Sequence, residues 1–249
     1  MTVSSKPRVI GCIPSRYAST RLPAKPLCDI GGQPMVLHVL KRALQAKSLD
    51  EVVVLTDDER ILNTVLDAGY QAVMTSSDCA SGTDRLADYM TQHGEGDIFV
   101  NMQGDEVLLD PSHIDQLVEC FTQNHQAEMG TLAHWVSDPA ILSDPTTAKV
   151  VTSKKGNALY FSRHCIPVTQ TGALPDRALI HIGVYIYTRE TLAQLTVIPQ
   201  TDLEQIEKLE QLRALESGIN IDVIVVDDFH SLSVDTPADL EKAQRLFSA

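Results

Sequence analysis

Residues 8–27, RVIGCIPSRYASTRLPAKPL, decide the fold expected for this chain. The apolar run Val9–Pro14 predicts a buried β-strand, and the loop after it carries the cations Arg16, Arg21 and Lys25. In an open parallel sheet, ligand-binding groups follow the carboxyl ends of the strands. Backbone N–H groups and guanidinium groups in such a loop can grip phosphate oxygens together. From charge alone, a solvated basic face explains the loop equally well.

The segments that follow alternate between strand and helix patterns as far as residue 124. The sequence predicts strands at 51–56, 71–74 and 97–102, and helices at 34–46, 59–68, 83–92 and 111–124. This alternation predicts a doubly wound, mostly parallel sheet of the Rossmann type. Strand-like runs then follow with little helix between them, at 129–136, 149–152, 158–162 and 180–187, with a polar loop at 169–177. A helix at 203–217, a strand at 221–226 and a helix at 237–248 complete the pattern, so we expect one α/β domain with an inserted β-rich subdomain over about 129–200.

Composition excludes several classes of protein. A net charge of −13 would repel a nucleic-acid backbone, although it leaves room for a local site for a nucleoside triphosphate. Neither a P-loop nor a G-x-G-x-x-G motif is present, and no apolar run is long enough to span a membrane. The N-terminus lacks the apolar core of a signal peptide, and the five cysteines form no C-x-x-C pair. We therefore expect a cytoplasmic chain with no nucleic-acid or membrane partner.

Two acidic segments could hold a metal ion, one after a predicted strand and one at the start of the last predicted helix. Asp105 lies in NMQGDE (101–106), where Gly104 allows a sharp turn, and Asp235 lies in VDTPADLE (234–241). Magnesium typically binds one or two carboxylates and completes its coordination with water and phosphate oxygens. A plain helix cap before Pro237 explains the second segment by itself, so the metal site depends on the two aspartates being paired.

Eight motifs in order resemble the 3-deoxy-manno-octulosonate (Kdo) cytidylyltransferase family, also called CMP-Kdo synthetases. They cover almost the whole chain: IPSRYASTRLPAKPL (13–27), TDDERI (56–61), SSDCASGTDR (76–85), NMQGDE (101–106), ALYFSR (158–163), HIGVY (181–185), EKLEQLR (207–213) and VDTPADLE (234–241). The resemblance implies a nucleotidyltransferase fold and transfer of CMP from CTP to the anomeric hydroxyl of Kdo, with release of pyrophosphate, for lipopolysaccharide biosynthesis. It also implies a homodimer formed through the β-rich subdomain, which would bind the sugar.

The resemblance assigns a role to each matching position. Arg16, Ser19, Thr20, Arg21 and Lys25 match the triphosphate loop, Ser81 and Gly82 approach the nucleotide, and Gln103 lies where nucleotide and sugar are recognised. Asp105 and Asp235 match the magnesium carboxylates, and the sugar-acid pocket is matched by Arg163, His181, Tyr185, Glu210 and Gln211. Arg16, Lys25, Asp105 and Asp235 would be catalytic, and Mg²⁺ would be the cofactor.

The sequence departs from the family at several positions. Ala24 replaces the usual glycine of LPGKPL, which would be unfavourable if the backbone there has a positive φ. Val107 replaces a proline, the segment CIPVTQTG (165–172) lacks the usual arginines, and Ile180 replaces a common arginine, so Arg177 is a candidate substitute. These changes leave open a related acceptor, such as 8-amino-Kdo or a sialic acid, or a nucleotide-binding protein without catalysis.

Several sugar-side positions also have a purely structural explanation. Arg163 could close a salt bridge at the end of a strand. His181 and Tyr185 share one strand face, where a buried histidine with satisfied hydrogen bonds would show the same pattern. Glu210 and Arg213 are three residues apart on a predicted helix and could pair with each other.

Overall fold

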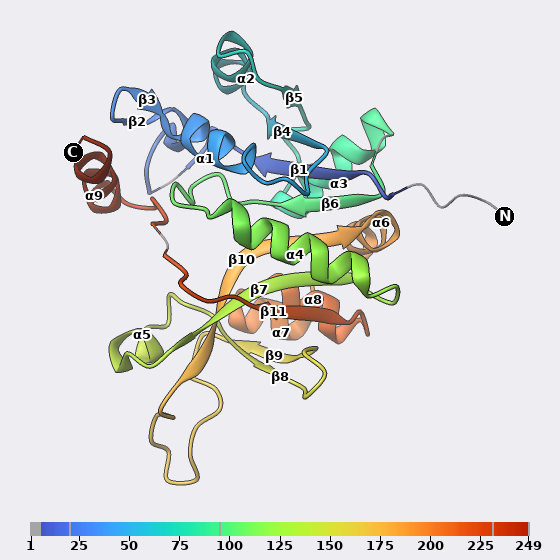
Figure 1. The fold of residues 1–249 in the computed structure, drawn as a ribbon, viewed down its shortest axis with the longest axis vertical. Coiled ribbons are helices and arrows are strands. Elements are labelled where there is room, and N and C mark those ends of the chain that lie inside the picture. Colours follow the sequence, from blue (N-terminus) through green and yellow to red (C-terminus); the bar gives the residue numbers. More distant parts are fainter. Residues whose placement is uncertain (1–5, 20, 95, 231, 249) are drawn as a thin grey trace, which may run out of the picture. The chain divides into compact units, whose positions relative to one another are not determined.

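A computed structural model describes residues 6–19, 21–94, 96–230 and 232–248 (Figure 1). The chain folds as two compact units: unit 1 is Met1–Asp115 with His230–Ala249, and unit 2 is Gln116–Phe229. Helix α4 (Pro111–Gln123) crosses the boundary between the two ranges. Within the described ranges, every helix is too short or too polar to cross a membrane.

Unit 1 contains a four-stranded parallel sheet in the order β6–β1–β4–β5. Its strands are β1 (Val9–Pro14), β4 (Glu51–Thr56), β5 (Ala72–Met74) and β6 (Ile98–Asn101). All three pairings are parallel, and Cys12 on β1 lies opposite both Val53 and Asn101. Because the strands are parallel, their carboxyl ends lie at one edge, where the predicted functional loops begin. The Rossmann-like fold predicted for this part is confirmed.

Helices and a short ribbon complete unit 1. The helices are α1 (Met35–Ala43), α2 (Glu59–Asp67), α3 (Gly82–His93) and α9 (Pro237–Phe247), with the 3₁₀ turn η1 (Lys25–Leu27) and the ribbon β2 (Asp29–Ile30) and β3 (Gln33–Pro34). Helix α9 lies beside this ribbon (Figure 1), where Gln244 Nε2 donates to Asp29 O at 2.8 Å. Helices α3 and α9 begin with capping boxes, at Ser81 and Thr236.

Unit 2 is built on strands of mixed direction. They are β7 (Met129–Val136), β8 (Lys149–Thr152), β9 (Ala158–Ser162), β10 (Ala178–Thr188) and β11 (Ile221–Val225). β7 is antiparallel to β10 and parallel to β11, while β8 is antiparallel to both β9 and β10. The helices are α5 (Pro139–Ser143), α6 (Arg189–Val197), α7 (Asp202–Glu207) and α8 (Gln211–Glu216). A β-rich unit was expected here, but its helices α5 and α6 were not.

The predicted helix at 203–217 is wrong in one respect, because the chain forms two short helices there. Lys208 ends α7 in the left-handed conformation, with φ 54°. Arg163 binds the carbonyl oxygens of Glu207 and Lys208, at 2.8 and 3.0 Å, which a continuous helix would use for its own hydrogen bonds. A partner 45 positions away in the sequence therefore breaks a segment whose local pattern is helical.

Candidate active site

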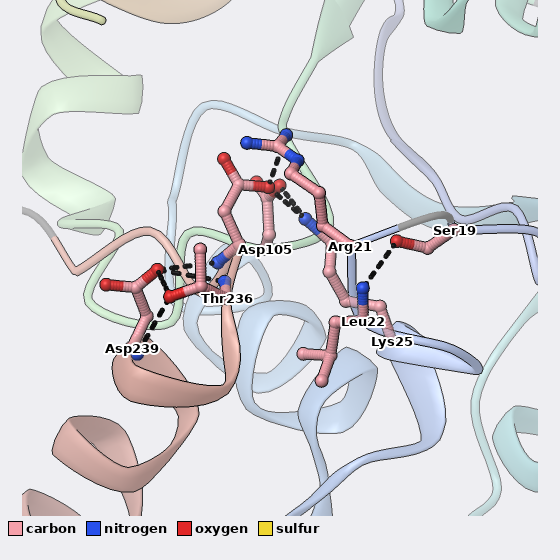
Figure 2. Close-up of polar contacts among 8 residues, drawn as sticks. Ser19, Arg21, Leu22, Lys25, Asp105, Thr236 and Asp239 are labelled. Atoms are coloured by element: carbon pink, nitrogen blue, oxygen red, sulfur yellow. Dashed lines mark hydrogen bonds and ion pairs between the residues drawn. The ribbon is translucent and has the colours of Figure 1, made fainter.

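Two carboxylates and two cations meet beyond the carboxyl ends of β1 and β6 in unit 1 (Figure 2). Lys25 Nζ lies 2.5 Å from Asp105 Oδ2 and 2.8 Å from Asp235 Oδ1. Arg21 Nη2 lies 3.0 Å from the same oxygen of Asp235. The structure thus brings together Asp105 and Asp235, whose pairing the predicted metal site requires, and Lys25 and Arg21 contact these carboxylates themselves.

Backbone contacts hold the two segments that carry these carboxylates. A Cβ atom on Gly104 would lie 2.9 Å from Ser15 Oγ and 3.0 Å from Pro14 O, so the turn before Asp105 approaches the end of β1 as only glycine allows. Val234 N donates to Asp105 O at 3.1 Å, and Val107 N donates to Leu232 O at 3.3 Å. These bonds join the segment of Asp105 to the segment that leads into Asp235. A proline at position 107 could not donate the second bond.

Ala24 and Lys25 form the end of the basic loop. Ala24 has φ 53° and ψ 32°. This is the left-handed conformation in which an alanine in place of the glycine of LPGKPL is unfavourable. Burial disfavours the charged form of Lys25, but attraction and hydrogen bonds from Asp105 and Asp235 outweigh it and raise the pKa of Lys25 above its ordinary value. Lys25 is therefore a firmly charged ammonium group between two carboxylates.

The TDDER segment anchors the start of the basic loop, a role that its sequence did not suggest. Asp57 Oδ1 accepts a hydrogen bond from Tyr17 N at 3.3 Å, and the guanidinium carbon of Arg60 lies 3.5 Å from the centre of the Tyr17 ring. Asp57 Oδ2 in turn receives Arg85 Nη2 at 2.9 Å, and the Arg85 side chain is only 3% exposed. Asp57 thus joins the loop to α3, and it does so through Tyr17, the residue that follows Arg16 in the sequence.

The remaining residues of the loop lie on its outer side. Arg16 is exposed, and within the described ranges it has no hydrogen-bond or ion-pair partner. Ser19 Oγ accepts from Leu22 N at 3.4 Å, which stabilises a local turn (Figure 2). Thr20, the other predicted triphosphate residue, lies outside the described residues.

Ser81 and Gly82 form the N-terminus of α3. The Ser81 hydroxyl belongs to the capping box with Asp84, at 3.2 Å from Asp84 N. A Cβ atom on Gly82 would lie 3.2 Å from Pro14 Cγ and 3.4 Å from Asn101 Nδ2, so glycine lets the helix start pack closely against the ends of β1 and β6. Gln103 lies two residues after the end of β6 and is partly buried. All three predicted nucleotide positions therefore lie at the carboxyl edge of the unit 1 sheet.

The donor set of Asp105 and Asp235 suits a magnesium ion. Both carboxylates approach one atom, Lys25 Nζ, so they point toward a common position. Within the described ranges, no group of three or more His, Cys, Asp and Glu residues could form a complete cage. Two hard oxygen donors with a shell completed by water and phosphate match the usual coordination of Mg²⁺.

His181 and Tyr185 lie side by side on β10 in unit 2, with ring centres 5.3 Å apart. His181 Nε2 is 3.0 Å from Thr131 Oγ1, and that hydroxyl donates its single hydrogen to Val184 O at 2.7 Å. His181 Nε2 is therefore the protonated nitrogen, which leaves Nδ1 as an acceptor. Burial lowers the pKa of His181 to about 3 and raises the pKa of Tyr185 well above its ordinary value, so both groups are neutral.

Arg163 holds backbone carbonyls in this structure. Besides the bonds to Glu207 O and Lys208 O, its Nη1 lies 3.3 Å from Pro145 O. Its backbone N–H donates to the Glu207 carboxylate at 2.9 Å. Within the described ranges the Arg163 side chain therefore binds backbone carbonyls in place of the salt bridge considered from the sequence, and a role in sugar binding stays a prediction.

Glu210 and Gln211 lie at the start of α8. Gln211 is 5% exposed, and its Nε2 has no hydrogen-bond partner within the described ranges. Glu210 contributes to the raised pKa of Tyr185, so the two side chains are near each other. Arg213, which the sequence could have paired with Glu210, forks onto Glu204 at 2.6 and 2.8 Å. A buried amide without a partner is unfavourable and points to a ligand.

The structure shows what surrounds Ile180, which replaces a common arginine, and Arg177, the candidate substitute. Ile180 is buried in an apolar cluster with Leu142 and Ala178, so an arginine would not suit this place without rearrangement. The guanidinium carbon of Arg177 lies 4.2 Å from the centre of the Trp135 ring. Arg177 therefore has a cation–π partner in unit 2, and its use as a substitute arginine stays a prediction.

Comparisons with known proteins identify the family. The pattern of the family described as "Cytidylyltransferase" matches residues 10–221. The chain is 44% identical over 247 residues to the 3-deoxy-manno-octulosonate cytidylyltransferase of Trichlorobacter lovleyi, covering 95% of this chain and 97% of the relative. It is 46% identical over 236 residues to the 8-amino-3,8-dideoxy-manno-octulosonate cytidylyltransferase of Shewanella amazonensis, covering 93% and 95%.

A solved structure agrees with these relatives. The structure of a CMP:2-keto-3-deoxy-manno-octonic acid synthetase complexed with CTP has a TM-score of 0.91 and 41% sequence identity, covering 97% of this chain and 98% of the other. The likeness of fold and sequence extends over both units of the chain. The chain therefore belongs to the cytidylyltransferase family, as a member of the group of 3-deoxy-manno-octulosonate cytidylyltransferases and their 8-amino relatives.

Proposed function

We propose that this chain is a magnesium-dependent enzyme that transfers CMP from CTP to the anomeric hydroxyl of Kdo and releases pyrophosphate. The observation that carries the proposal is the meeting of Lys25 and Arg21 with Asp105 and Asp235 at the carboxyl edge of a parallel sheet. The names of the relatives and the CTP in the related synthetase structure support the choice of nucleotide and sugar.

The reaction needs positioning and charge neutralisation more than covalent chemistry. The anomeric oxygen of the sugar forms a bond to the α-phosphorus while the bond from that phosphorus to the bridging oxygen of pyrophosphate breaks. The hydroxyl proton passes to solvent, and pyrophosphate leaves with the electrons of the broken bond. Arg16, Arg21 and Lys25 supply positive charge for the triphosphate and the departing pyrophosphate. Magnesium held by Asp105 and Asp235 would neutralise phosphate charge and lower the pKa of a bound hydroxyl.

Unit 2 supplies the groups that we assign to the sugar acid. Gln211 offers a buried N–H donor, His181 offers Nδ1 as an acceptor, and Tyr185 stays a neutral hydroxyl. A polyhydroxylated sugar acid matches this mixture of donors and acceptors. Arg163 would bind the sugar carboxylate if it exchanged a backbone carbonyl for it.

The direct test follows pyrophosphate release from CTP with magnesium and Kdo, against a control without sugar. Release above the control is expected, and Asp105→Asn or Asp235→Asn should remove most of it. The matched control is Asp67→Asn, an exposed aspartate at the end of α2, which should keep wild-type turnover. Binding of CTP with no turnover on any acceptor would instead favour a nucleotide-binding protein without catalysis.

A second candidate function keeps the reaction and changes the acceptor to 8-amino-Kdo. The Shewanella relatives of this name are as similar to the chain as the Kdo enzymes are, and Ile180 fills the place of a common arginine with an apolar side chain. Parallel assays with Kdo, 8-amino-Kdo and a sialic acid separate the candidates by kcat/KM. A clear preference for Kdo would exclude this second function.

We also infer that the protein acts in the cytoplasm, in lipopolysaccharide biosynthesis, as a homodimer. The exposed apolar side chains of Trp135, Leu159 and Val168 in unit 2 support self-association through that unit, with exposed fractions of 47%, 62% and 57%. Light scattering on the purified protein should give twice the monomer mass. A monomer at micromolar concentration would contradict this part of the proposal.

A further inference from the structure

The Lys25 ammonium group lies at the point where the two proposed metal-binding carboxylates meet. It contacts Asp105 at 2.5 Å and Asp235 at 2.8 Å, and Figure 2 shows its side chain reaching from the basic loop to Asp105. Arg21 adds a third contact, to Asp235. The cluster therefore contains two cations and two anions, and its charges cancel without any ligand.

Structural stabilisation alone does not explain this arrangement. The backbone segments that carry the two aspartates are held by the Gly104 turn and by the hydrogen bonds from Val234 to Asp105 and from Val107 to Leu232, none of which involves Lys25. Two carboxylates held so close to one point repel each other unless a cation lies between them. The lysine supplies that cation from a loop whose other cations face a triphosphate in the proposed function.

We propose that Lys25 is an internal counter-ion that occupies the metal position, and that the triphosphate of CTP withdraws it so that metal and nucleotide bind cooperatively. This inference rests on the proposed function of the same site. A metal ion that binds alone must displace the ammonium group, which then loses its partners. CTP that binds alone draws Lys25 away, which leaves Asp105 without a cation and Asp235 with Arg21 alone.

When both ligands bind, neither loss occurs, because the phosphates receive Lys25 and the metal receives the carboxylates. Each ligand therefore raises the affinity for the other, and the coupling is equal in both directions. Couplings of this kind typically correspond to about 5- to 150-fold in affinity. The Lys25 and Asp105 side chains are only 17% and 20% exposed, so solvent and salt screen their attraction weakly. The exchange of partners therefore changes the binding free energy of each ligand.

The first experiment measures binding of Mn²⁺, used as a spectroscopic substitute for Mg²⁺, to the nucleotide-free protein by electron paramagnetic resonance. Lys25→Met should bind Mn²⁺ about tenfold more tightly than the wild type, within the range of such couplings. Arg21→Met removes an equal charge from the same cluster but leaves the ammonium group in place, so its gain should be clearly smaller. Lys41→Met, at an exposed lysine of α1 that contacts Gln33, is the control and should match the wild type.

Equal gains in Lys25→Met and Arg21→Met would overturn the proposal, because charge alone would then explain them. Unchanged or weaker binding in Lys25→Met would also overturn it. The experiment uses neither CTP nor sugar, so its failure is distinct from an absence of pyrophosphate release, which would refute the proposed function.

The second experiment measures CTP binding with EDTA present, in a double-mutant cycle of Asp105→Asn and Lys25→Met. Asp105→Asn releases one bond of Lys25 and should tighten metal-free CTP binding severalfold in the wild-type background. The same substitution should have a much smaller effect in the Lys25→Met background, where no ammonium group remains to be released. Equal tightening in both backgrounds would show simple charge repulsion and would refute the exchange.

Discussion

Replacing Ala24 by glycine should stabilise the protein, even though glycine usually destabilises. Ala24 has φ 53° and ψ 32°, a left-handed conformation that costs an L-residue about 1–2 kcal/mol. Glycine removes that strain but gives the unfolded chain more freedom, which is unfavourable by about 0.4–1 kcal/mol. The difference predicts a net gain of at most about 1.6 kcal/mol and of about 0.8 kcal/mol at the midpoints of the two ranges, which is a rise in Tm of about 2–3 °C for a chain of this size.

A thermal melt followed by calorimetry tests this gain, with Ala68→Gly as the matched control. Ala68 is an exposed alanine outside a strand, whereas Ala24 is partly buried, and Ala68 has φ −78° and ψ 0°, the ordinary right-handed region. Glycine there brings only the entropic loss, so its Tm should fall by about 1–4 °C. Equal decreases in Tm for both variants would show that position 24 carries no strain, and the reasoning would be wrong.

Three further predictions concern buried polar groups. Arg85→Met leaves Asp57 without its buried partner and should lower the free energy of unfolding, measured in urea, by about 3–5 kcal/mol. The control Arg60→Met breaks an exposed pair and should lower it by at most about 1 kcal/mol. Burial lowers the pKa of His181 to about 3, so its contribution to stability is complete above its unfolded pKa of about 6.5. Below that pH the free energy of unfolding should fall by up to about 1.4 kcal/mol per pH unit. The variant His181→Gln should lose this slope, and parallel pH profiles of variant and wild type would refute the prediction. Gln211→Met removes a buried amide without a partner, so it should leave stability unchanged or raise it by about 1 kcal/mol. It should raise KM for the sugar acid severalfold and leave KM for CTP unchanged. A rise in both KM values would contradict the sugar assignment.

The carboxyl-edge rule explains why much of unit 1 could be predicted. Asp105 follows a predicted strand, so its place at the carboxyl edge could be inferred from the sequence, whereas its pairing with Asp235, 130 positions away, came from the family resemblance. Ala24 was recognised as a strained position because the family motif places glycine there. In both cases the deciding information lies within a few residues of the position itself.

The sequence could not predict structure that depends on distant partners. The helical pattern at 203–217 is locally sound, and only Arg163, from another strand, shows why it breaks at Lys208. Asp57 directly follows a predicted strand, and nothing near it in the sequence shows that it joins Tyr17 to a buried arginine of α3. The sugar-side roles stay predictions for the same reason, since they depend on which groups around β10 and α8 remain free for a ligand.

Lys25 has one role assigned by the sequence motif and another shown by its contacts. The motif assigns it to the departing pyrophosphate, whereas its contacts in the structure are the two carboxylates. Both assignments hold if they describe successive states, because one ammonium group cannot serve the carboxylates and a triphosphate equally at once. Opposite charges brought so close also make the cluster neutral in a chain of net charge −13, so the site does not repel the first anionic ligand as the protein as a whole would. The basic loop would then act as the partner of the metal site before the nucleotide arrives and as the partner of the nucleotide afterwards.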